Sequence, residues 1–235
     1  ARRLRSLRLR SFAGYFSYLE RHEEEWQQFI NALTTNLTAF FRENHHFAML
    51  ASHVRKHAHQ HRPLRIWCSA SSTGEEPYSL AMTVIEALDS FTPAVEIIAS
   101  DIDTGVLSVA RNGIYPEERI ELLEPARKKR FFLRGKGGQS GKVRVRPELQ
   151  ALIEFRQINL LDSNWGIEPG LDVIFCRNVM IYFDKATQNK ILERMVHLLR
   201  PDGLFFAGHS EGFVQATHLV KLIERTVYRP ALKGA

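Results

Sequence analysis

From Leu64 onward the chain alternates between short apolar runs and amphipathic segments, and this alternation limits the fold more than any other feature. "LRIWCSA" precedes "EEPYSLAMTVIEAL", and "VEIIASDID" precedes "TGVLSVARNG", which Gly113 closes. Apolar runs that alternate with helical segments are typical of parallel strands covered by helices on both faces. We therefore predict an α/β domain with a mostly parallel sheet over residues 63–235.

The later segments repeat this scheme with one interruption. "LDVIFCRNV" and "LFFAGHSE" are predicted strands on either side of the helix "KATQNKILERMVHLLRPDG", and "RTVYRPAL" is predicted as a last, edge strand. Residues 130–160 instead alternate without a helical period and carry glycines at their centre, which predicts an antiparallel β insertion at about 131–157. The final run "LIEFRQINL" is expected to return to the main sheet.

The N-terminal part is expected to form a small all-helical domain over residues 1–62, ending before Pro63. Trp26, Phe29, Ile30 and Leu33 follow one another at helical spacing and define one apolar face. The polar run "KHAHQHRP" breaks the helical pattern. Its alternating histidines have no acidic or Cys partner nearby, so we interpret it as a solvated linker and predict no metal site. These histidines are His57, His59 and His61.

The composition limits the compartment and leaves the partner open. The net charge is +6, and five of the first ten residues are Arg, a pattern compatible with binding to nucleic acid, a lipid surface or an acidic protein, or with a solvated helix face.

No apolar run approaches the roughly 20 residues of a membrane-spanning helix, so we expect a cytoplasmic protein without membrane insertion. Cys68 and Cys176 lie in apolar, strand-like runs and are predicted to be reduced core thiols. Because the chain does not begin with Met, its natural N-terminus is expected to lie upstream.

The turn between the first predicted strand and helix indicates the ligand. It has a single glycine, Gly74, and its adjacent carboxylates Glu75 and Glu76 would repel a pyrophosphate, so the turn favours a cationic ligand. Asp101 ends the second strand, where a carboxylate accepts from ribose hydroxyls, and Asn159 with Leu160 follows the third, where they suit an adenine ring. A nucleoside with a positive charge and an amino-acid part describes S-adenosylmethionine, although carboxylates after strands are also common helix caps.

Several motifs occur together and in order: "TTNLTAFFRENHHF", "STGEEPYSLAM", "ASDIDTGVL", "INLL", "FCRNVMIYFD" and "LLRPDGLFFAGHSE". Over nearly the whole chain they resemble the bacterial chemotaxis receptor methyltransferases of the CheR type. The resemblance implies a class I, Rossmann-like S-adenosylmethionine-dependent methyltransferase domain behind a small helical domain. It also implies methyl transfer to glutamate side chains of chemoreceptors, with S-adenosylhomocysteine as the product and no metal.

The same resemblance assigns roles to individual residues. Arg42 and Tyr182 are implied to be catalytic, against the alternatives of an interdomain ion pair for Arg42 and a core aromatic for Tyr182. The residues implied to contact the cofactor are Asn36, Thr38, Arg42, Glu76, Asp101, Asn159, Leu160 and Asn178.

The insertion is similar to the antiparallel subdomain of receptor methyltransferases that are tethered by a peptide at the receptor's C-terminus. This similarity implies that the C-terminal tail of a chemoreceptor binds through Arg134, Gly135, Gly137 and Arg144, and that a monomeric enzyme is recruited to receptor clusters at the inner membrane. Two rival hypotheses are a nucleic-acid methyltransferase, although "RNVMIYF" lacks the Pro-Pro of the amino-methyltransferases, and a scaffold that binds receptor and cofactor without turnover.

Overall fold

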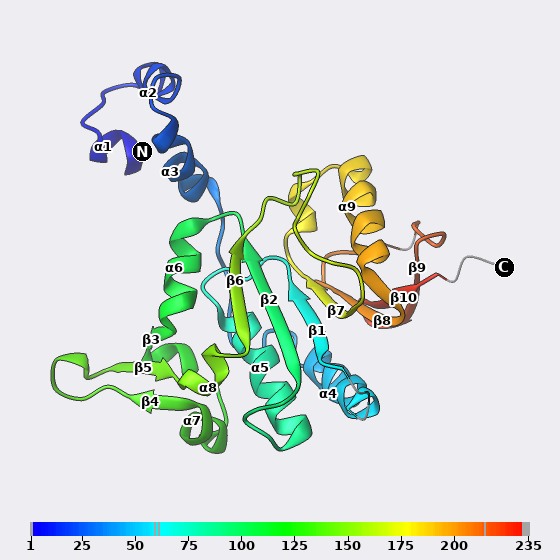
Figure 1. The fold of residues 1–235 in the computed structure, drawn as a ribbon. Coiled ribbons are helices and arrows are strands. Elements are labelled where there is room, and N and C mark those ends of the chain that lie inside the picture. The colour runs from blue at the N-terminus through cyan, green and yellow to red at the C-terminus, as the bar shows by residue number, and fades with distance from the viewer. Residues whose placement is uncertain (1, 59, 61, 214, 232–235) are drawn as a thin grey trace.

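The computed structural model describes residues 2–58, 60, 62–213 and 215–231, and a seven-stranded sheet forms the centre of the fold (Figure 1). The strand order is β6-β2-β1-β7-β8-β10-β9; the first five strands are parallel, and β10 and β9 are antiparallel to their neighbours. The predicted sheet is confirmed, but β9 forms the edge in place of the predicted β10. The strands span Ile153–Gln157 (β6), Val95–Asp101 (β2), Leu64–Cys68 (β1), Leu171–Cys176 (β7), Leu199–Ala207 (β8), Val227–Pro230 (β10) and Val220–Glu224 (β9).

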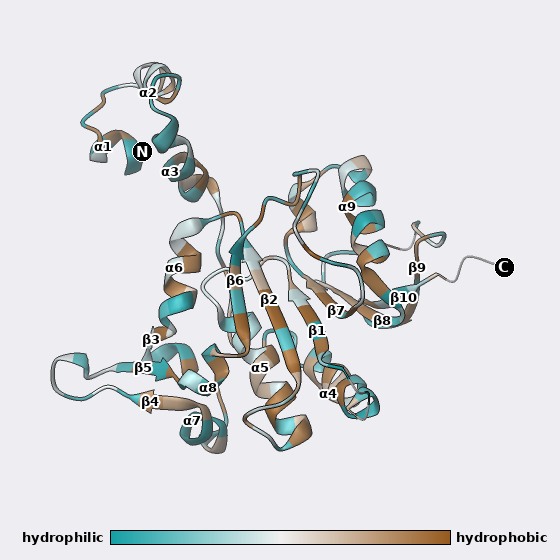
Figure 2. Ribbon diagram, in the orientation of Figure 1, coloured by the Kyte–Doolittle hydropathy of each residue, from teal (hydrophilic) through white to brown (hydrophobic). Residues whose placement is uncertain are grey.

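Helices cover both faces of this sheet because alternate side chains of each strand point to opposite sides. In β1, Ile66 and Cys68 belong to one hydrophobic core while Trp67 belongs to the other. The first core contains α4 (His45–His57) and α5 (Glu75–Leu88), and the second contains α9 (Lys185–Leu198). Figure 2 shows the central strands as largely hydrophobic ribbon, as expected for strands buried on two faces. A further helix, α6 (Thr104–Asn112), packs against β2 and β6.

A second, three-stranded antiparallel sheet projects from the main domain (Figure 1). Its order is β3 (Ile114–Pro116), β5 (Lys142–Val145) and β4 (Phe132–Arg134). The predicted insertion is therefore present, but its third strand comes from upstream of the expected start, while Ile153–Gln157 joins the main sheet as predicted. Short helices connect these strands: η1 (Glu117–Ile120), α7 (Pro125–Phe131), η2 (Gly137–Gln139) and α8 (Pro147–Gln150), and η3 (Met180–Tyr182) follows β7.

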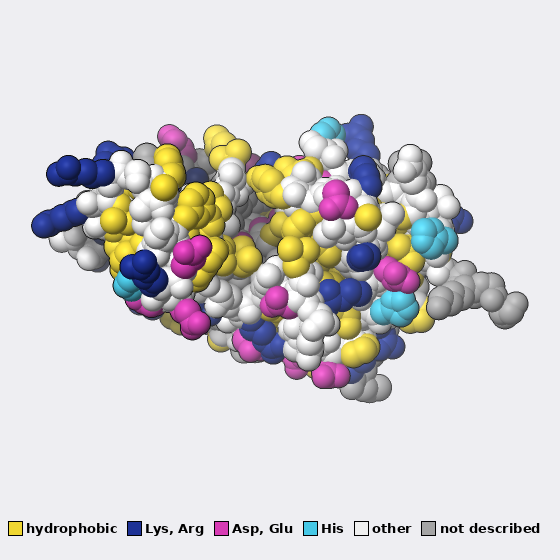
Figure 3. Space-filling view, turned by 90° about the horizontal axis from the view of Figure 1, so that it is seen from above, with side chains coloured by type: hydrophobic (Ala, Val, Ile, Leu, Met, Phe, Trp, Pro, Cys, Tyr) yellow, Lys and Arg dark blue, Asp and Glu magenta, His cyan; other side chains and the backbone are white. Residues whose placement is uncertain are grey.

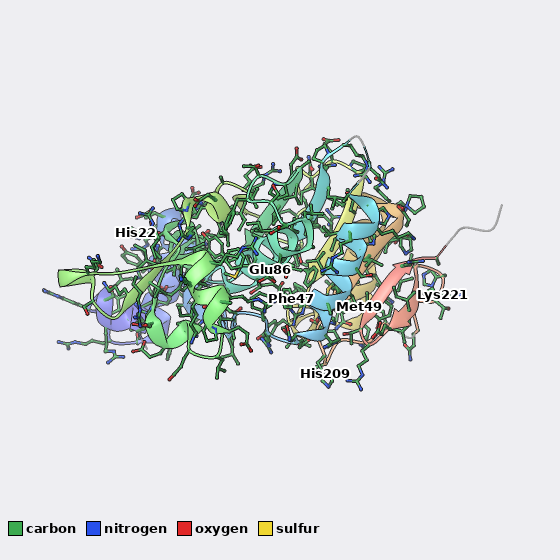
Figure 4. The ribbon with its side chains drawn as sticks, turned by 90° about the horizontal axis from the view of Figure 1, so that it is seen from below. His22, Phe47, Met49, Glu86, His209 and Lys221 are labelled. Atoms are coloured by element: carbon green, nitrogen blue, oxygen red, sulfur yellow. The ribbon has the colours of Figure 1, made fainter. Side chains whose placement is uncertain are left out.

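Three helices, α1 (Arg2–Ser6), α2 (Phe12–Leu19) and α3 (Glu23–Leu33), form a group at the N-terminus. A partly buried ion pair between Arg3 and Glu25 joins α1 to α3, and the Tyr15 hydroxyl donates to the same carboxylate at 2.8 Å. The next helix, α4, packs along α5 and contributes Phe47 to the main core. Figure 4 shows Phe47 of α4 near Glu86 of α5. The domain boundary after residue 62 stays a prediction. Although α4 precedes this boundary, its apolar residues belong to the hydrophobic core of the main sheet.

Two sequence expectations concern buried polar groups. Cys68 and Cys176 are buried free thiols, as predicted. His57 contradicts the solvated-linker interpretation, because it is buried at the end of α4 and its Nε2 lies 3.1 Å from a carboxylate oxygen of Asp202. His59 and His61 lie outside the described residues. Within the described part of the chain, no helix is long and apolar enough to cross a membrane.

Candidate functional site

A cavity of about 440 Å³ opens at the carboxyl ends of β1, β2 and β7, between these strand ends and the segment that joins α3 to α4. We call that segment, residues 34–44, the linker. Figure 3 looks onto this edge and shows the surface hollowed there, with hydrophobic side chains on both sides of the hollow. Every residue predicted to be catalytic or cofactor-binding lines this cavity: Asn36, Thr38, Arg42, Glu76, Asp101, Asn159, Leu160, Asn178 and Tyr182.

The turn between β1 and α5 takes its shape from Gly74. Its φ of 101° lies in the region that favours glycine, and a Cβ there would lie 2.8 Å from the Tyr115 hydroxyl oxygen and 2.9 Å from the Ala110 Cβ. Ser72, in the same turn, also has a positive φ of 47°. A phosphate-binding turn uses its glycines to expose backbone N–H groups, whereas this single glycine permits close packing of the turn on its neighbours.

Asp101, at the end of β2, is fixed by the backbone. Its Oδ2 accepts from the Ser72 N–H at 2.8 Å, and its Oδ1 accepts from the Asp103 N–H at 3.0 Å. Burial raises the pKa of this carboxyl, and the two backbone N–H groups oppose the rise. Each oxygen keeps acceptor capacity for a further donor. Asp101 therefore presents an oriented acceptor pair to the cavity.

Glu76 forms the charged end of the cavity together with Arg177. The Arg177 Nη1 donates to Glu76 at 2.7 Å, its Nη2 lies 3.2 Å from Glu43, and the same Nη2 donates to the Arg42 carbonyl oxygen at 2.6 Å. The Cys68 thiol lies 3.2 Å from the other Glu76 oxygen. Burial raises the pKa of Glu76, while Arg177 opposes the rise. Arg177 thus joins the main sheet to the linker at Arg42 and Glu43.

The expectation that Glu75 also faces the ligand is wrong. Its side chain has no exposed surface, and it pairs with Arg119 of η1 and accepts from the Thr73 hydroxyl at 2.6 Å. Helical geometry explains the difference, because consecutive residues of α5 point about 100° apart and only one of the two carboxylates can face the cavity.

Polar contacts attach the linker to the main domain, in addition to the buried rings of Phe40 and Phe41. Asp103 accepts from the Thr34 hydroxyl at 2.6 Å and from the Asn36 amide at 3.0 Å. The Phe41 N–H donates to the Ser79 hydroxyl at 2.9 Å. Phe41 and Glu43, which flank Arg42, have φ values of 53° and 57°, a conformation that costs energy and persists only where surrounding contacts fix it.

Arg42 and Tyr182 lie at the mouth of the cavity. The Arg42 Nη1 donates to the Leu37 carbonyl oxygen at 2.9 Å, and among the described residues Arg42 forms no ion pair. Tyr182 is 61% exposed, which excludes the alternative of a core aromatic. Both side chains are accessible to a substrate that approaches from outside.

Comparison with known proteins identifies the family. The family model described as "CheR methyltransferase, SAM binding domain" matches residues 36–229, and "CheR methyltransferase, all-alpha domain" matches residues 1–34. "Chemotaxis protein methyltransferase 2" of Pseudomonas aeruginosa is 65% identical over 98% of this chain and 82% of its own length. "Chemotaxis protein methyltransferase" of Salmonella typhimurium is 52% identical over 97% of this chain and 78% of its own length.

The chain belongs to the CheR methyltransferase family. It is an S-adenosylmethionine-dependent methyltransferase. The CheR cavity fits this cofactor, since it offers oriented carboxylate oxygens at Asp101 and apolar walls at Ile158 and Leu160. Within the described residues, no group of three or more His, Cys, Asp or Glu side chains is placed to hold a metal ion.

The structure adds a CheR residue that the sequence reasoning did not select. Glu211 is buried and accepts from three backbone N–H groups, those of Asn178 at 2.8 Å, Met180 at 2.7 Å and Gly208 at 2.6 Å. It therefore fixes the loop that carries Asn178, whose φ is 58°, and Tyr182. The only signal was its place at the end of "LFFAGHSE", as the last residue of a predicted strand.

The four residues predicted to bind a receptor peptide lie in the small sheet, away from the cavity lining. Arg134 is 78% exposed and pairs with Glu117, and Arg144 is exposed on β5. Gly135 is required by the loop itself, because a Cβ there would lie 2.0 Å from the Gln139 carbonyl oxygen. Gly137 has a φ of 57° with open space around it. Their role stays a prediction.

Proposed function

We propose that this CheR enzyme transfers the methyl group of S-adenosylmethionine to glutamate side chains of chemoreceptors and forms methyl esters. The observation that carries the proposal is the convergence of nine predicted residues, which lie far apart in the sequence in the linker and after four strands, on one cavity of about 440 Å³. The proposal assigns Asp101 to the ribose hydroxyls, Asn159 and Leu160 to the adenine, and Glu76 to the ammonium group of the cofactor.

The acceptor needs no general base. A glutamate with an ordinary pKa of about 4.3 is already ionised near neutral pH. The bound cofactor supplies an electrophilic methyl group on a positively charged sulfur. A carboxylate and a sulfonium lose their charges when they react, so removing the pair from water favours the transition state, and alignment contributes most of the rate.

Arg42 and Tyr182 are proposed to position the acceptor carboxylate at the mouth. One donor of the Arg42 guanidinium is used by Leu37, and its other donors are available to a carboxylate. Because a tight ion pair would lower the nucleophilicity of the carboxylate, a hydrogen bond from Tyr182 would orient it with less loss. Both groups lie where a receptor side chain can enter, and the cofactor would occupy the interior.

We further propose that the small sheet binds the C-terminal tail of the receptor. Arg134 and Arg144 are exposed cations, and a strand-like peptide with an acidic side chain or terminal carboxylate matches that chemistry. A tail on a flexible tether supplies an effective concentration on the order of mM without contacts at the cavity. The enzyme is proposed to act as a monomer, on protein and not on nucleic acid.

Transfer of a labelled methyl group to receptor membranes tests the proposal. Parent enzyme is expected to label the receptor with methyl groups that mild base releases as methanol, since esters are base-labile. Arg42→Ala is expected to lose at least ~100-fold in turnover while the affinity for S-adenosylhomocysteine changes less. Label in base-stable products, or an Arg42→Ala variant with parental turnover, would contradict the proposal.

A further inference from the structure

The small sheet contacts both walls of the cofactor cavity. The Tyr115 hydroxyl, on β3, donates to the Thr73 carbonyl oxygen at 2.7 Å. Arg119, in η1 directly after β3, pairs with Glu75 and donates from Nη2 to the Thr38 carbonyl oxygen at 3.0 Å. Thr73 belongs to the turn between β1 and α5, and Thr38 belongs to the linker. The Arg119 guanidinium therefore connects the linker to Glu75, the first residue of α5 after that turn, and Arg119 does not itself line the cavity.

The burial of Glu75 explains why an Arg is needed there. Its side chain has no exposed surface, and its two oxygens are occupied by Arg119 and by the Thr73 hydroxyl. A carboxylate in such a place is stable only when paired with a cation. The planar fork of Arg119 satisfies Glu75 and keeps a donor for the Thr38 carbonyl, whereas a Lys ammonium is a compact charge that lacks this fork.

Aromatic packing connects the same parts. The ring of Phe40, in the linker, meets the ring of Tyr115 edge-on at 5.2 Å between centroids and that of Phe132, on β4, at 5.4 Å. All three rings are buried. The linker therefore packs on the small sheet through Phe40 and is hydrogen-bonded to it at Thr38, between the cavity-lining residues Asn36 and Arg42.

We propose that Arg119 is a positioning residue for cofactor binding, and that the small sheet supports the cofactor site in addition to any contact with a receptor. Arg119 sets the position of the linker relative to the turn, and so the distance between the cavity walls that carry Thr38 and Glu76. The inference rests on cofactor use by the family and is independent of tail-peptide binding.

Calorimetric titration with S-adenosylhomocysteine tests the proposal without a receptor. Arg119→Lys keeps a cation beside Glu75 but lacks the donor for Thr38, so we expect the Kd to rise ~3- to 10-fold while the Tm stays within a few degrees of the parent. The matched control is Arg65→Lys. Arg65 also joins a carboxylate, Glu96 at 3.6 Å, to a carbonyl oxygen, that of Pro169 at 2.8 Å, but at the amino end of β1. The Kd of the Arg65→Lys variant for S-adenosylhomocysteine is expected to equal the parental value.

A second pair of variants separates positioning from stability. Arg119→Met leaves Glu75 buried without a cation and is expected to lower the Tm strongly, whereas Glu75→Gln combined with Arg119→Met removes that charge and should recover much of the Tm. The double variant should still bind S-adenosylhomocysteine at least ~3-fold more weakly than the parent. A Kd within twofold of the parent in Arg119→Lys, or full recovery of affinity in the double variant, would overturn the proposal. Failure of the proposed function would appear instead as lost methyl transfer with intact cofactor binding.

Discussion

Arg177, beside the cofactor cavity, and Arg134, in the small sheet, are presented in opposite ways. Arg177, at the end of β7, has no exposed side-chain surface and is paired with Glu76 and Glu43. Arg134, in the small sheet, is 78% exposed and is paired with Glu117 alone. Buried groups in ion pairs define one geometry, which suits a small ligand of fixed shape. Exposed groups retain mobility, which suits a peptide whose side chains vary. The comparison therefore predicts a preorganised cofactor site beside an adaptable protein-binding surface.

The largest expected effect is the loss of stability on replacing Arg177, compared with the same replacement at Arg134. Arg177→Met leaves Glu76 and Glu43 without their shared cation, so the free energy of unfolding should fall by ~3–5 kcal/mol. Arg134→Met, the matched control, should lower it by less than ~1 kcal/mol because its pair is exposed to solvent. Urea unfolding of both variants gives the two values. Equal losses of unfolding free energy in the two variants would contradict the comparison.

Acid should destabilise the main domain through two buried histidines. Burial is the main cause that lowers the pKa of His46 and of His53 to about 4, and Arg177 beside His46 and the imidazole of His57 beside His53 act in the same direction. The unfolded chain binds a proton at each histidine from about pH 6.5 downward, whereas the folded chain does so only near pH 4. The free energy of unfolding is therefore at its full value above pH 6.5 and falls as the pH drops from 6.5 to 4. At pH 5 each of the two histidines should therefore lower the free energy of unfolding by ~2 kcal/mol.

Urea unfolding at pH 7 and pH 5 measures this loss. His53→Leu should reduce the difference between the two pH values by about half, and it breaks no hydrogen bond of the His53 Nε2, which has no partner in the described chain. The small sheet contributes nothing to the effect, because residues 114–146 contain no histidine. An unchanged pH dependence in His53→Leu would exclude His53 as a source.

Gly74, in the turn beside the cavity, and Gly137, in the loop between β4 and β5, allow the same two regions to be compared through backbone substitutions. Gly74→Ala places a methyl group within 3 Å of Tyr115 and Ala110 at a positive φ, whereas Gly137→Ala meets no atom within 4 Å. Both variants incur the left-handed penalty of ~1–2 kcal/mol, and overpacking adds ~1–3 kcal/mol for Gly74 alone. Thermal unfolding should show the difference, and only Gly74→Ala should also weaken S-adenosylhomocysteine binding. A greater loss in Gly137→Ala would contradict the packing of the turn.

The smallest expected effect concerns the receptor tail. Arg144→Ala should weaken binding of a tail peptide ~3- to 10-fold, an effect reduced by added salt, and should leave the S-adenosylhomocysteine Kd unchanged. Methylation of a receptor fragment that lacks the tail should also be unchanged. Equal losses on tailed and tailless receptors would show that the small sheet does not separate binding of the tail from catalysis.

Local signals in the sequence predicted the main elements closely. Glu75–Leu88 and Thr104–Asn112 were recognisable because Gly74 and Gly113 border them and their apolar residues recur at helical spacing. β3 was missed since a three-residue strand has too few positions to show an alternation. Phe47, Leu50 and Val54 recur at helical spacing on α4, but a periodic pattern does not specify the surface against which a helix packs.

The candidate site was predictable where chemistry follows a strand end, as at Asp101, and through motif resemblance at Arg42 and Tyr182. The partners of these residues were not predictable. Arg177 and Glu211 act through contacts with groups far along the chain, and Arg119 was hidden in a short connection between two strands. Charge pairs between distant segments exist only in the folded chain, so a single sequence carries no local signal for them.

The most direct test of the account is a calorimetric titration of S-adenosylhomocysteine into the parent chain and into Asp101→Asn. Asparagine has one acceptor oxygen where Asp101 has two, so it keeps the hydrogen bond to one of the two backbone N–H groups, of Ser72 or Asp103, and loses the charged acceptor proposed for the ribose. Thermal unfolding of Asp101→Asn, measured beside the titration, checks that the variant is folded at the temperature used. The account predicts saturable binding to the parent and a Kd at least ~10-fold higher in Asp101→Asn. Absence of binding to the parent, or the same Kd for both chains, would contradict it.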